Sequence, residues 1–211
     1  MSTLNTPSSD RITPEDALET IVNNSIHDDR SFSNIKLEAK KKIIEAEFTG
    51  CEFKSCKFSE VSFFDCRFED CIFENCNMGS ISIKHTSFQD VMFKDTKLTG
   101  IQWAEASNPL DANFNRCLMN YSSFIGVNLR NTVLLDCELK DTDFTEANLS
   151  KSNCRLSDFS RARFVNTNLV QADFTDARNY SIHPDGNLLG KTKFSLPEAL
   201  SLLAVYDIIL T

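Results

Sequence analysis

Glycine and proline are scarce in this chain, which has 6 Gly and 5 Pro among its 211 residues. Long apolar runs are missing too, since no stretch approaches the roughly 18 residues of a membrane-spanning helix. The opening MSTLNTPSSDRITPEDALET contains no apolar segment of the kind found in secretory signal peptides. These absences predict a cytoplasmic protein with no membrane contact.

Motifs of metal sites and catalytic centres are also absent. The 8 cysteines include no Cys-x-x-Cys pair and no cluster with histidine, which are typical of zinc sites. The 3 histidines are scattered, and the neighbouring carboxylates of Asp141 and Asp143 are expected to be solvated. We therefore expect no cofactor, no metal and no catalytic residue, and a protein that is not an enzyme.

What the chain does have is phenylalanine, 17 in all, placed within a five-residue repeat. The stretch from Cys51 to Met78 shows the unit: a small apolar residue, a variable residue, a large apolar residue (the centre) and two mostly polar residues. A period of five fits neither an α-helix nor a β-strand. Units this short bury their apolar side only by stacking on their neighbours, so the repeat predicts a solenoid.

The repeat runs in two blocks. The 25 centres recur every five residues from Phe48 to Trp103 and again from Phe114 to Phe174. Between the blocks the pattern slips by one residue over 104–111, where an Asn-Pro pair predicts a loop. The solenoid is therefore expected to contain one short break.

Residues two positions after the centres explain how the chain can turn so often. Gly, Asn and Asp are frequent there, and these residue types tolerate left-handed backbone or form side-chain-assisted turns. If four five-residue sides make one coil, residues 20 apart stack about 4.8 Å from each other, and the 25 centres give about six coils. The turn residues are Gly50, Gly100, Gly126, Asn75, Asn131, Asn166, Asp65, Asp70, Asp90, Asp95, Asp136, Asp141 and Asp176.

Seven of the cysteines occupy the small apolar position, where other repeats have Ala, Ser, Thr, Val or Ile. This usage is typical of cysteine as a small hydrophobic residue. We expect free, buried thiols there, in preference to disulfides or metal ligands.

The remaining segments lie on either side of the repeat. Residues 1–30 are polar, and a short helix is expected from about Pro14 to Asn23 because Pro14 follows a threonine that can cap it. Residues 31–180 are expected to form the solenoid. Residues 181–211 are expected to form a C-terminal helix and tail.

The C-terminal helix is predicted to have an apolar surface. Ser195 and Glu198 match an S-x-x-E capping box, so the helix should run from about Leu196 to Tyr206. Such a segment is not expected to lie bare at the end of a rod. Either it caps the last coil only, or, as we favour, it also pairs with its own copy in a two-fold dimer. The residues expected at that interface are Leu196, Leu200, Leu203 and Tyr206.

Over about residues 46–177 this pattern resembles the pentapeptide repeat family. The resemblance implies an all-β solenoid, a right-handed quadrilateral β-helix with Phe or Leu at the centre. Within the family, the chain is most similar to the subgroup of albicidin-resistance, Qnr, Mfp and microcin-immunity proteins. The similarity rests on runs such as Cys56-Lys57-Phe58-Ser59-Glu60 and Gly100-Ile101-Gln102-Trp103, and on the tail Asn179-Tyr180-Ser181-Ile182-His183 with Phe194-Ser195-Leu196-Pro197-Glu198-Ala199.

The resemblance also implies a function. Proteins of this subgroup are similar to duplex DNA in size and charge, form dimeric rods, bind DNA gyrase or topoisomerase IV, and protect the enzyme from inhibitors such as albicidin or quinolones. The implied role is that of a non-catalytic DNA mimic and homodimer. This chain has no long loop projecting from a coil, only the short break near Asn108, whereas such loops matter for quinolone protection by Qnr proteins.

Charge supports a basic partner. The chain has 30 acidic and 22 basic residues and a net charge of −8, which disfavours direct nucleic-acid binding. The side centred on Phe48, Phe68 and Phe88 has one base, Arg67, against several acids. We predict that these acids form a partner-binding strip: Glu47, Glu69, Asp70 and Asp90.

Three apolar residues stand where polar ones are expected. Phe64 follows a centre and should point outward, and Ile72 and Met92, 20 apart, should stack on one face. They are either covered by the N-terminal segment or part of a partner site. A continuous apolar patch around them would favour the alternative function, a pentapeptide-repeat scaffold that binds an unrelated protein.

Overall fold

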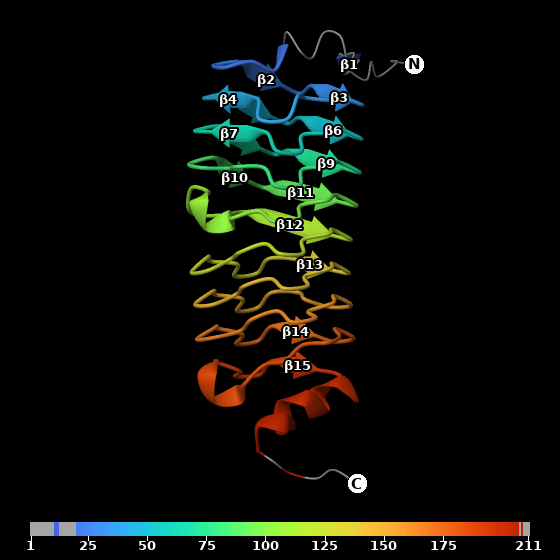
Figure 1. Ribbon diagram of the computed structural model, residues 1–211, viewed down its shortest axis with the longest axis vertical. Helices are drawn as coiled ribbons and strands as arrows, with labels where there is room; N and C mark the ends of the chain where they lie inside the picture. The colour runs from blue at the N-terminus through green and yellow to red at the C-terminus, as the bar shows by residue number, and fades with distance from the viewer. Residues whose placement is uncertain (1–10, 13–19, 207, 209–211) are drawn as a thin grey trace, which may run out of the picture.

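The computed structural model describes residues 11–12, 20–206 and 208. These residues form a rod of about eight stacked turns, with the first coils at one end and the C-terminal segment at the other (Figure 1). The expected all-β solenoid is confirmed. Within the described residues, no helix is long and apolar enough to cross a membrane.

Each coil has four sides. We name each side after one of its members in the coil that contains β4, β5, β6 and Lys57, in chain order: the β4 side, the β5 side, the β6 side and the Lys57 side. Strands of one side pair in parallel with the coils above and below. The β4 side pairs β4 (Lys42–Ile44) with β7 (Ser62–Phe64). The β5 side has the order β10 (Ser87–Gln89), β8 (Arg67–Glu69), β5 (Glu47–Thr49) and β2 (Ile26–Asp28).

The β6 side carries the longest ladder. Its order is β1 (Arg11–Ile12), β3 (Ser31–Ser33), β6 (Glu52–Lys54), β9 (Ile72–Glu74), β11 (Val91–Lys94), β12 (Ala112–Asn115) and β13 (Leu134–Leu135). Single bridges continue it to β14 (Asp173–Phe174), which pairs with β15 (Lys193–Phe194). The Lys57 side is joined by single parallel bridges from Lys36 to Arg178.

The stacking register is 20 residues, as predicted, with two exceptions. Phe53 pairs with Phe73, whereas Phe93 pairs with Phe114, 21 residues on. The second pairing confirms the one-residue slip over 104–111, where the 3₁₀ helix η1 (Trp103–Glu105) begins the excursion. The other extra residue lies between Lys36, which bridges to Lys57, and β4.

The ladder extends beyond both repeat blocks, which explains why there are about eight turns instead of six. Strand β2 pairs with β5, and Leu188 bridges to Asn168 near the 3₁₀ helix η2 (Pro184–Gly186). Hydrogen-bonded coils are therefore present on both sides of residues 31–180.

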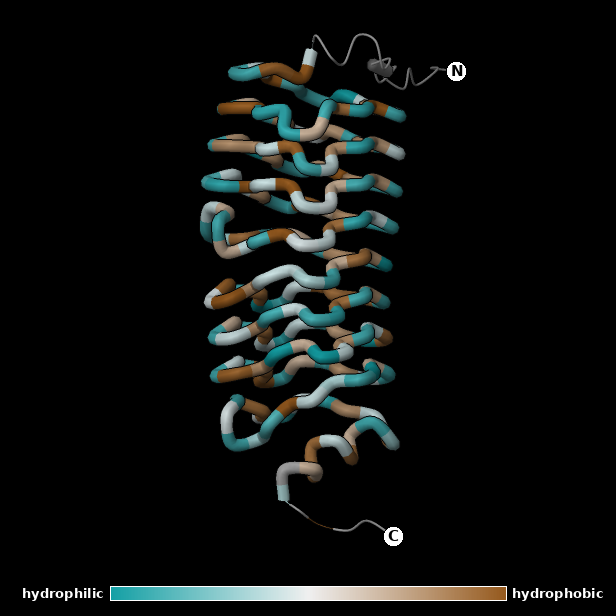
Figure 2. The backbone as a smooth tube through the Cα atoms, viewed as in Figure 1, coloured by the Kyte–Doolittle hydropathy of each residue, from teal (hydrophilic) through white to brown (hydrophobic). Residues whose placement is uncertain are grey.

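The centres form the core as stacks of rings. Phe73 lies between Phe53, at 4.5 Å between ring centroids, and Phe93, at 5.0 Å, both nearly parallel to it. Around one coil the rings meet edge to face, as Phe48 and Phe53 do at 5.5 Å. Offset stacks and edge-to-face pairs are the favourable aromatic geometries, so phenylalanine suits both directions of packing. In Figure 2 the polar residues alternate along the tube with these apolar ones.

The corners confirm the predicted turn chemistry. All thirteen turn residues named from the sequence have positive φ, for example 52° at Asp70 and 63° at Asn131. Glycine is needed at few corners because aspartate and asparagine adopt this conformation at moderate cost. Other residue types also stand at corners with positive φ, among them Ser55, Lys151 and Leu156.

The small inward position does more than fill space. All 8 cysteines are free and buried, as expected, but most of their thiols also donate to the carbonyl oxygen of a centre in the preceding coil, as Cys71 does to Phe48 at 3.4 Å. Thr96 and Ser157 make the same contact with Phe73 and Leu134, at 3.1 and 2.7 Å. The position therefore favours side chains that are small and can donate.

The two terminal helices differ from expectation. The N-terminal helix expected over Pro14 to Asn23 lies mainly outside the described residues. Of its predicted end only Thr20 is helical, and 21–23 are not. The C-terminal helix η3 (Glu198–Tyr206) is of 3₁₀ type and begins two residues later than predicted. Its capping box does not form, for the reason given below.

Candidate partner-binding surface

The structure brings the predicted acidic strip together on the β5 side. Glu47 begins β5, Glu69 ends β8, and Asp70 and Asp90 occupy the corners that follow β8 and β10. Because β5, β8 and β10 are neighbours in one sheet, these side chains lie on consecutive coils. Glu47, Asp70 and Asp90 are exposed and Glu69 is half-buried.

Four further acids extend this strip, and sequence reasoning missed them. Asp28 and Asp29 lie at the end of β2, in the segment assigned to the N-terminal region, and Glu45 and Asp65 occupy the corners just before the β5 side. Extending the 21-residue register upstream of Phe48 would have found the first two. We call the whole set the acidic face: Asp28, Asp29, Glu45, Glu47, Asp65, Glu69, Asp70 and Asp90.

Little positive charge neutralises the acidic face. Arg67 pairs with Glu69 at 2.5 Å, and the ring of His85 lies 3.2 Å from Asp65. The other six acids form no ion pair with any described residue. A shallow hollow of about 420 Å³, lined in part by Glu45, Glu47, Asp65 and Arg67, runs along this face.

The neighbouring β6 side shows the opposite arrangement, because its charges pair with each other. Glu52 binds Lys54 at 2.7 Å, Glu74 binds Lys94, and Asp95 binds Arg116 through two contacts of 2.7 Å. Hydrogen bonding to these cations lowers the pKa of the Glu74 and Asp95 carboxyl groups. Of these two neighbouring sides, the β5 side therefore carries most of the unpaired acids.

The three predicted apolar residues do not form one patch. Ile72 and Met92 are register partners, 40% and 37% exposed. Phe64 lies on the β4 side, which is opposite the β6 side because the β5 side separates them in the coil. Its half-buried ring lies 4.6 Å from the ammonium group of Lys42 and 5.3 Å from the His85 ring.

At the C-terminal end, the side chains of the expected capping box serve the last coil instead. Ser195 Oγ accepts from the backbone N–H of Asp176 at 2.9 Å, and the Glu198 carboxylate accepts from that of Asn179. The backbone carbonyl of Ser195, which stands where the regular ladder would offer an acceptor to Asp176, accepts instead from the Ala199 N–H at 2.9 Å. Using both side chains there leaves η3 without its cap.

The predicted interface residues lie on this end segment. Leu196, Leu200 and Tyr206 are 77%, 44% and 52% exposed. Leu203 is half-buried, and the neighbouring Leu202 packs against the core. One part of the segment thus covers the last coil while another presents apolar side chains to solvent.

The acids considered for catalysis are accounted for within the described part of the chain. Asp141 pairs with Arg161 and not with Asp143, whose carboxylate accepts from the Thr145 N–H at 2.8 Å. No group of three metal-binding side chains is found among the described residues.

The sequence profile of the pentapeptide repeat region matches residues 46–108 and 110–174. The chain belongs to the pentapeptide repeat family. The two matched segments meet at the break that the register slip defines, so the family pattern and the coil geometry agree on where the repeat is interrupted.

Solved structures of QnrB1, described as a plasmid-mediated fluoroquinolone resistance protein, are similar to this pentapeptide repeat protein. A trypsin-treated variant aligns with a TM-score of 0.68 at 19% identity, over 86% of this chain and 97% of that one. The full-length form aligns with a TM-score of 0.58 at 18% identity, over 95% and 96%. No curated protein sequence matches significantly. At this identity the similarity concerns the fold.

Proposed function

We propose that this pentapeptide repeat protein is a non-catalytic binding protein whose acidic face occupies a basic, DNA-binding surface of a type II topoisomerase such as DNA gyrase. By occupying that surface it protects the enzyme from inhibitors that act on its complex with DNA. The proposal rests on the family resemblance of the subgroup and, in this structure, on one observation: the acidic face.

The charge density of the acidic face supports this proposal. Its eight carboxylates, offset by Arg67, lie on four consecutive coils, which span about 19 Å at about 4.8 Å per coil. That is roughly one net charge per 2.7 Å, compared with about one per 1.7 Å of duplex DNA. A straight, rigid row of fixed charges fits a protein surface that normally binds a straight polyanion, because little ordering is needed on binding.

A two-fold dimer through the C-terminal segment fits the same role. The exposed side chains of Leu196, Leu200 and Tyr206 would be buried against a second copy. The acidic faces lie near the other end of each rod, so pairing through η3 would place one acidic face toward each outer end of a longer particle.

The alternative is a scaffold that binds an unrelated protein through apolar contacts. Phe64 lies opposite Ile72 and Met92, and Lys42 and His85 contact its ring. Ile72 and Met92 alone form only a small exposed apolar patch. The acidic face is therefore the better-supported binding surface.

Supercoiling by purified DNA gyrase, with and without albicidin or a quinolone, tests the proposal. We expect the chain to restore supercoiling in the presence of at least one of these inhibitors, or to inhibit the enzyme by itself at higher concentration. If it neither inhibits nor rescues at micromolar concentrations, the proposed function is wrong.

A further inference from the structure

The side opposite the acidic face carries unpaired charge of the other sign. Lys36, Lys57 and Lys97 project from one column of the Lys57 side. Lys36 bridges directly to Lys57, and Asn77 stands between Lys57 and Lys97. Lys40 and Lys41 stand at the corner that follows this side. All except the half-buried Lys41 are exposed. We call these five residues the lysine face.

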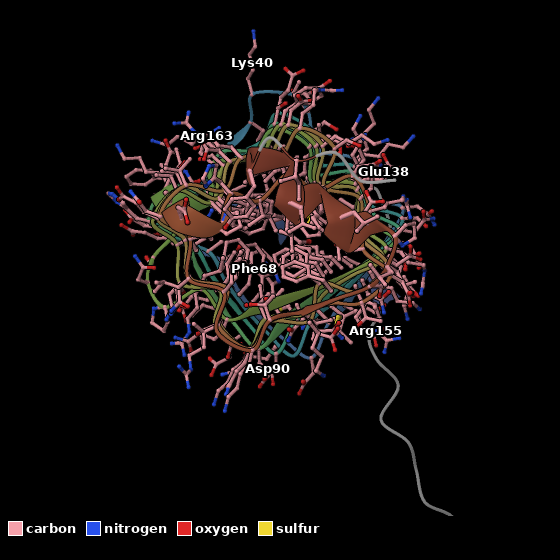
Figure 3. All side chains as sticks on the ribbon, turned by 90° about the horizontal axis from the view of Figure 1, so that it is seen from below. Lys40, Phe68, Asp90, Glu138, Arg155 and Arg163 are labelled. Carbon is pink, nitrogen blue, oxygen red and sulfur yellow. The ribbon has the colours of Figure 1, made fainter. Side chains whose placement is uncertain are left out.

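The two charged faces lie across the rod from each other. The Lys57 side follows the β6 side and precedes the β4 side, so the β5 side is opposite it. In the view along the rod, Lys40 and Asp90 are at opposite edges (Figure 3). At least about 10 Å of core and two side-chain lengths separate the faces, which exceeds the Debye length of about 8 Å at physiological salt. Each face therefore presents its own charge to a partner.

The lysines are not neutralised within the rod. None of the five forms an ion pair with a described carboxylate, although Glu38 and Glu60 stand near them in the coil. The β6 side again provides the contrast. Lys54 and Lys94 stand three residues before Lys57 and Lys97 in the chain, and each binds a glutamate, Glu52 and Glu74 respectively. Free lysines in a straight column leave room for an external anion.

The surroundings of the column are rich in hydrogen-bonding groups. A hollow of about 400 Å³ beside it is lined by Lys57, Lys97, Ser55, Asn75 and Asn77, and by one acid, Asp95, which is paired with Arg116. A second hollow of about 190 Å³ on the other side of Lys97 is lined by Ser59, Ser80, Asn77 and Thr99, with one acid, Glu60. Exposed apolar residues enter the column only at Leu118.

We propose that the lysine face binds the sugar-phosphate backbone of a nucleic acid duplex. Lys, Ser, Thr and Asn side chains are those that contact phosphate and sugar oxygens without reading the bases. A column with one position per coil, about 4.8 Å apart, follows a linear polyanion along the rod. The two exposed apolar side chains one coil beyond Lys97, Leu118 and Tyr121, are too few for a lipid surface. The net charge of the whole chain, −8, does not reveal the local positive charge of the lysine face, because the acidic face lies on the opposite side.

The binding is inferred to be weak, independent of sequence and dependent on salt. Three to five lysine–phosphate contacts give affinities toward the weak end of about 10⁻⁴ to 10⁻⁶ M for non-specific binding. This inference does not rest on topoisomerase binding, because it uses another face and another ligand.

The test is fluorescence anisotropy of a labelled 20-base-pair duplex, with the full chain and its variants, at several salt concentrations from about 50 mM upward. In the variant Lys57→Gln with Lys97→Gln we expect an affinity loss of about fivefold or more, and a fall of about 2 in the slope of log affinity against log salt. The matched control is Lys54→Gln with Lys94→Gln, which removes the same charge from the same two coils, and it should change affinity by less than about twofold.

Three outcomes would overturn the inference. The wild-type chain could fail to bind the duplex at the lowest salt. Both double variants could lose affinity equally, which would show a general effect of charge. Polyglutamate could displace the duplex at equal charge concentration, which would indicate an acidic protein as the ligand instead. Circular dichroism of each variant establishes that the solenoid is intact.

Discussion

Ser195 Oγ accepts a hydrogen bond of 2.9 Å from the backbone N–H of Asp176. In the inner coils the corresponding corner N–H donates to a carbonyl one coil further on, as Asn75 does to Lys94 at 3.0 Å. At Asp176 the corresponding carbonyl, that of Ser195, accepts from the Ala199 N–H at 2.9 Å, and the Ser195 side chain takes its place as acceptor. The end of the solenoid is thus closed by side-chain acceptors, which is one way in which a repeat protein terminates its ladder.

Removing this acceptor should loosen the last coil. In Ser195→Ala the Asp176 N–H loses its partner, at a cost of about 1 kcal/mol, and its amide hydrogen should exchange faster while amides of the first block are unchanged. Ser201→Ala is the control, because the Ser201 hydroxyl is buried with no partner among the described residues and its loss should not destabilise. Unchanged exchange at Asp176 would contradict the capping role.

The stacked core predicts a graded response at Phe73, whose ring is fully buried between Phe53 and Phe93. Phe73→Ala should lower the free energy of unfolding by about 3 to 5 kcal/mol. Phe73→Leu should cost less, about 1 to 2 kcal/mol, because leucine fills most of the space and stands at Leu134 in the same column. Urea unfolding followed by circular dichroism measures both; equal losses would contradict the stacking account.

Stability should fall in alkaline solution because of the buried thiols. Burial raises the pKa of Cys154 to about 12 from the ordinary value of 9.0. The folded chain therefore keeps this proton while the unfolded chain loses it, so a stabilisation that is complete below pH 9 declines as the pH rises toward 12, by about 4 kcal/mol in total.

Unfolding at several pH values, followed by the fluorescence of the buried Trp103, checks the predicted fall in stability as the pH rises. Cys154→Ala should show a shallower decline between about pH 9 and 11 than the wild-type chain, whatever its stability at neutral pH. A parallel decline in both proteins would show that other groups, such as Tyr180, whose pKa burial and Glu198 raise to about 12, account for the effect.

The proposed dimer predicts a change of mass on mutation of the C-terminal segment. Leu200→Asp with Tyr206→Asp should convert a dimer into a monomer of 23.9 kDa, because a carboxylate cannot be buried unpaired in an apolar interface. Leu188→Asp, at a residue 61% exposed on the last coil, should leave the dimer intact. Sedimentation equilibrium distinguishes these results, and a wild-type monomer at high concentration would refute the dimer.

Most of the fold was predictable from the sequence because each repeat position has one strong physical requirement. Positions such as Phe73 must be large and apolar, and positions such as Asp70 must accept positive φ, so both patterns are visible in a single chain. The register across 104–111 needed the structure, since a slip of one residue can be absorbed in several ways.

The surface was less predictable. Glu69 and Asp70 were assigned correctly to one side, but Asp28 and Asp29 were missed. The centre before them is His27, a polar residue that does not resemble a centre in the sequence, although it is buried and stacks on Phe48. The roles of Ser195 and Glu198 were also mistaken. Their spacing matches a helix cap. Only the structure shows that they accept hydrogen bonds from the backbone N–H groups of Asp176 and Asn179 instead.

The central claim is that the acidic face binds the basic, DNA-binding surface of a type II topoisomerase. The most direct measurement is the affinity for purified DNA gyrase of two proteins, the wild-type chain and the double variant Asp70→Lys with Asp90→Lys. Each is measured with and without competing duplex. The matched control is Asp136→Lys with Glu146→Lys, which makes the same charge change at exposed corners of the second block, where φ is likewise positive.

We expect competing duplex to displace the wild-type chain, the acidic-face variant to lose affinity by about tenfold or more, equivalent to about 1.4 kcal/mol or more, and the control to bind nearly as the wild type does. Equal affinity of the two variants, or binding of the wild-type chain that duplex does not displace, would contradict the account.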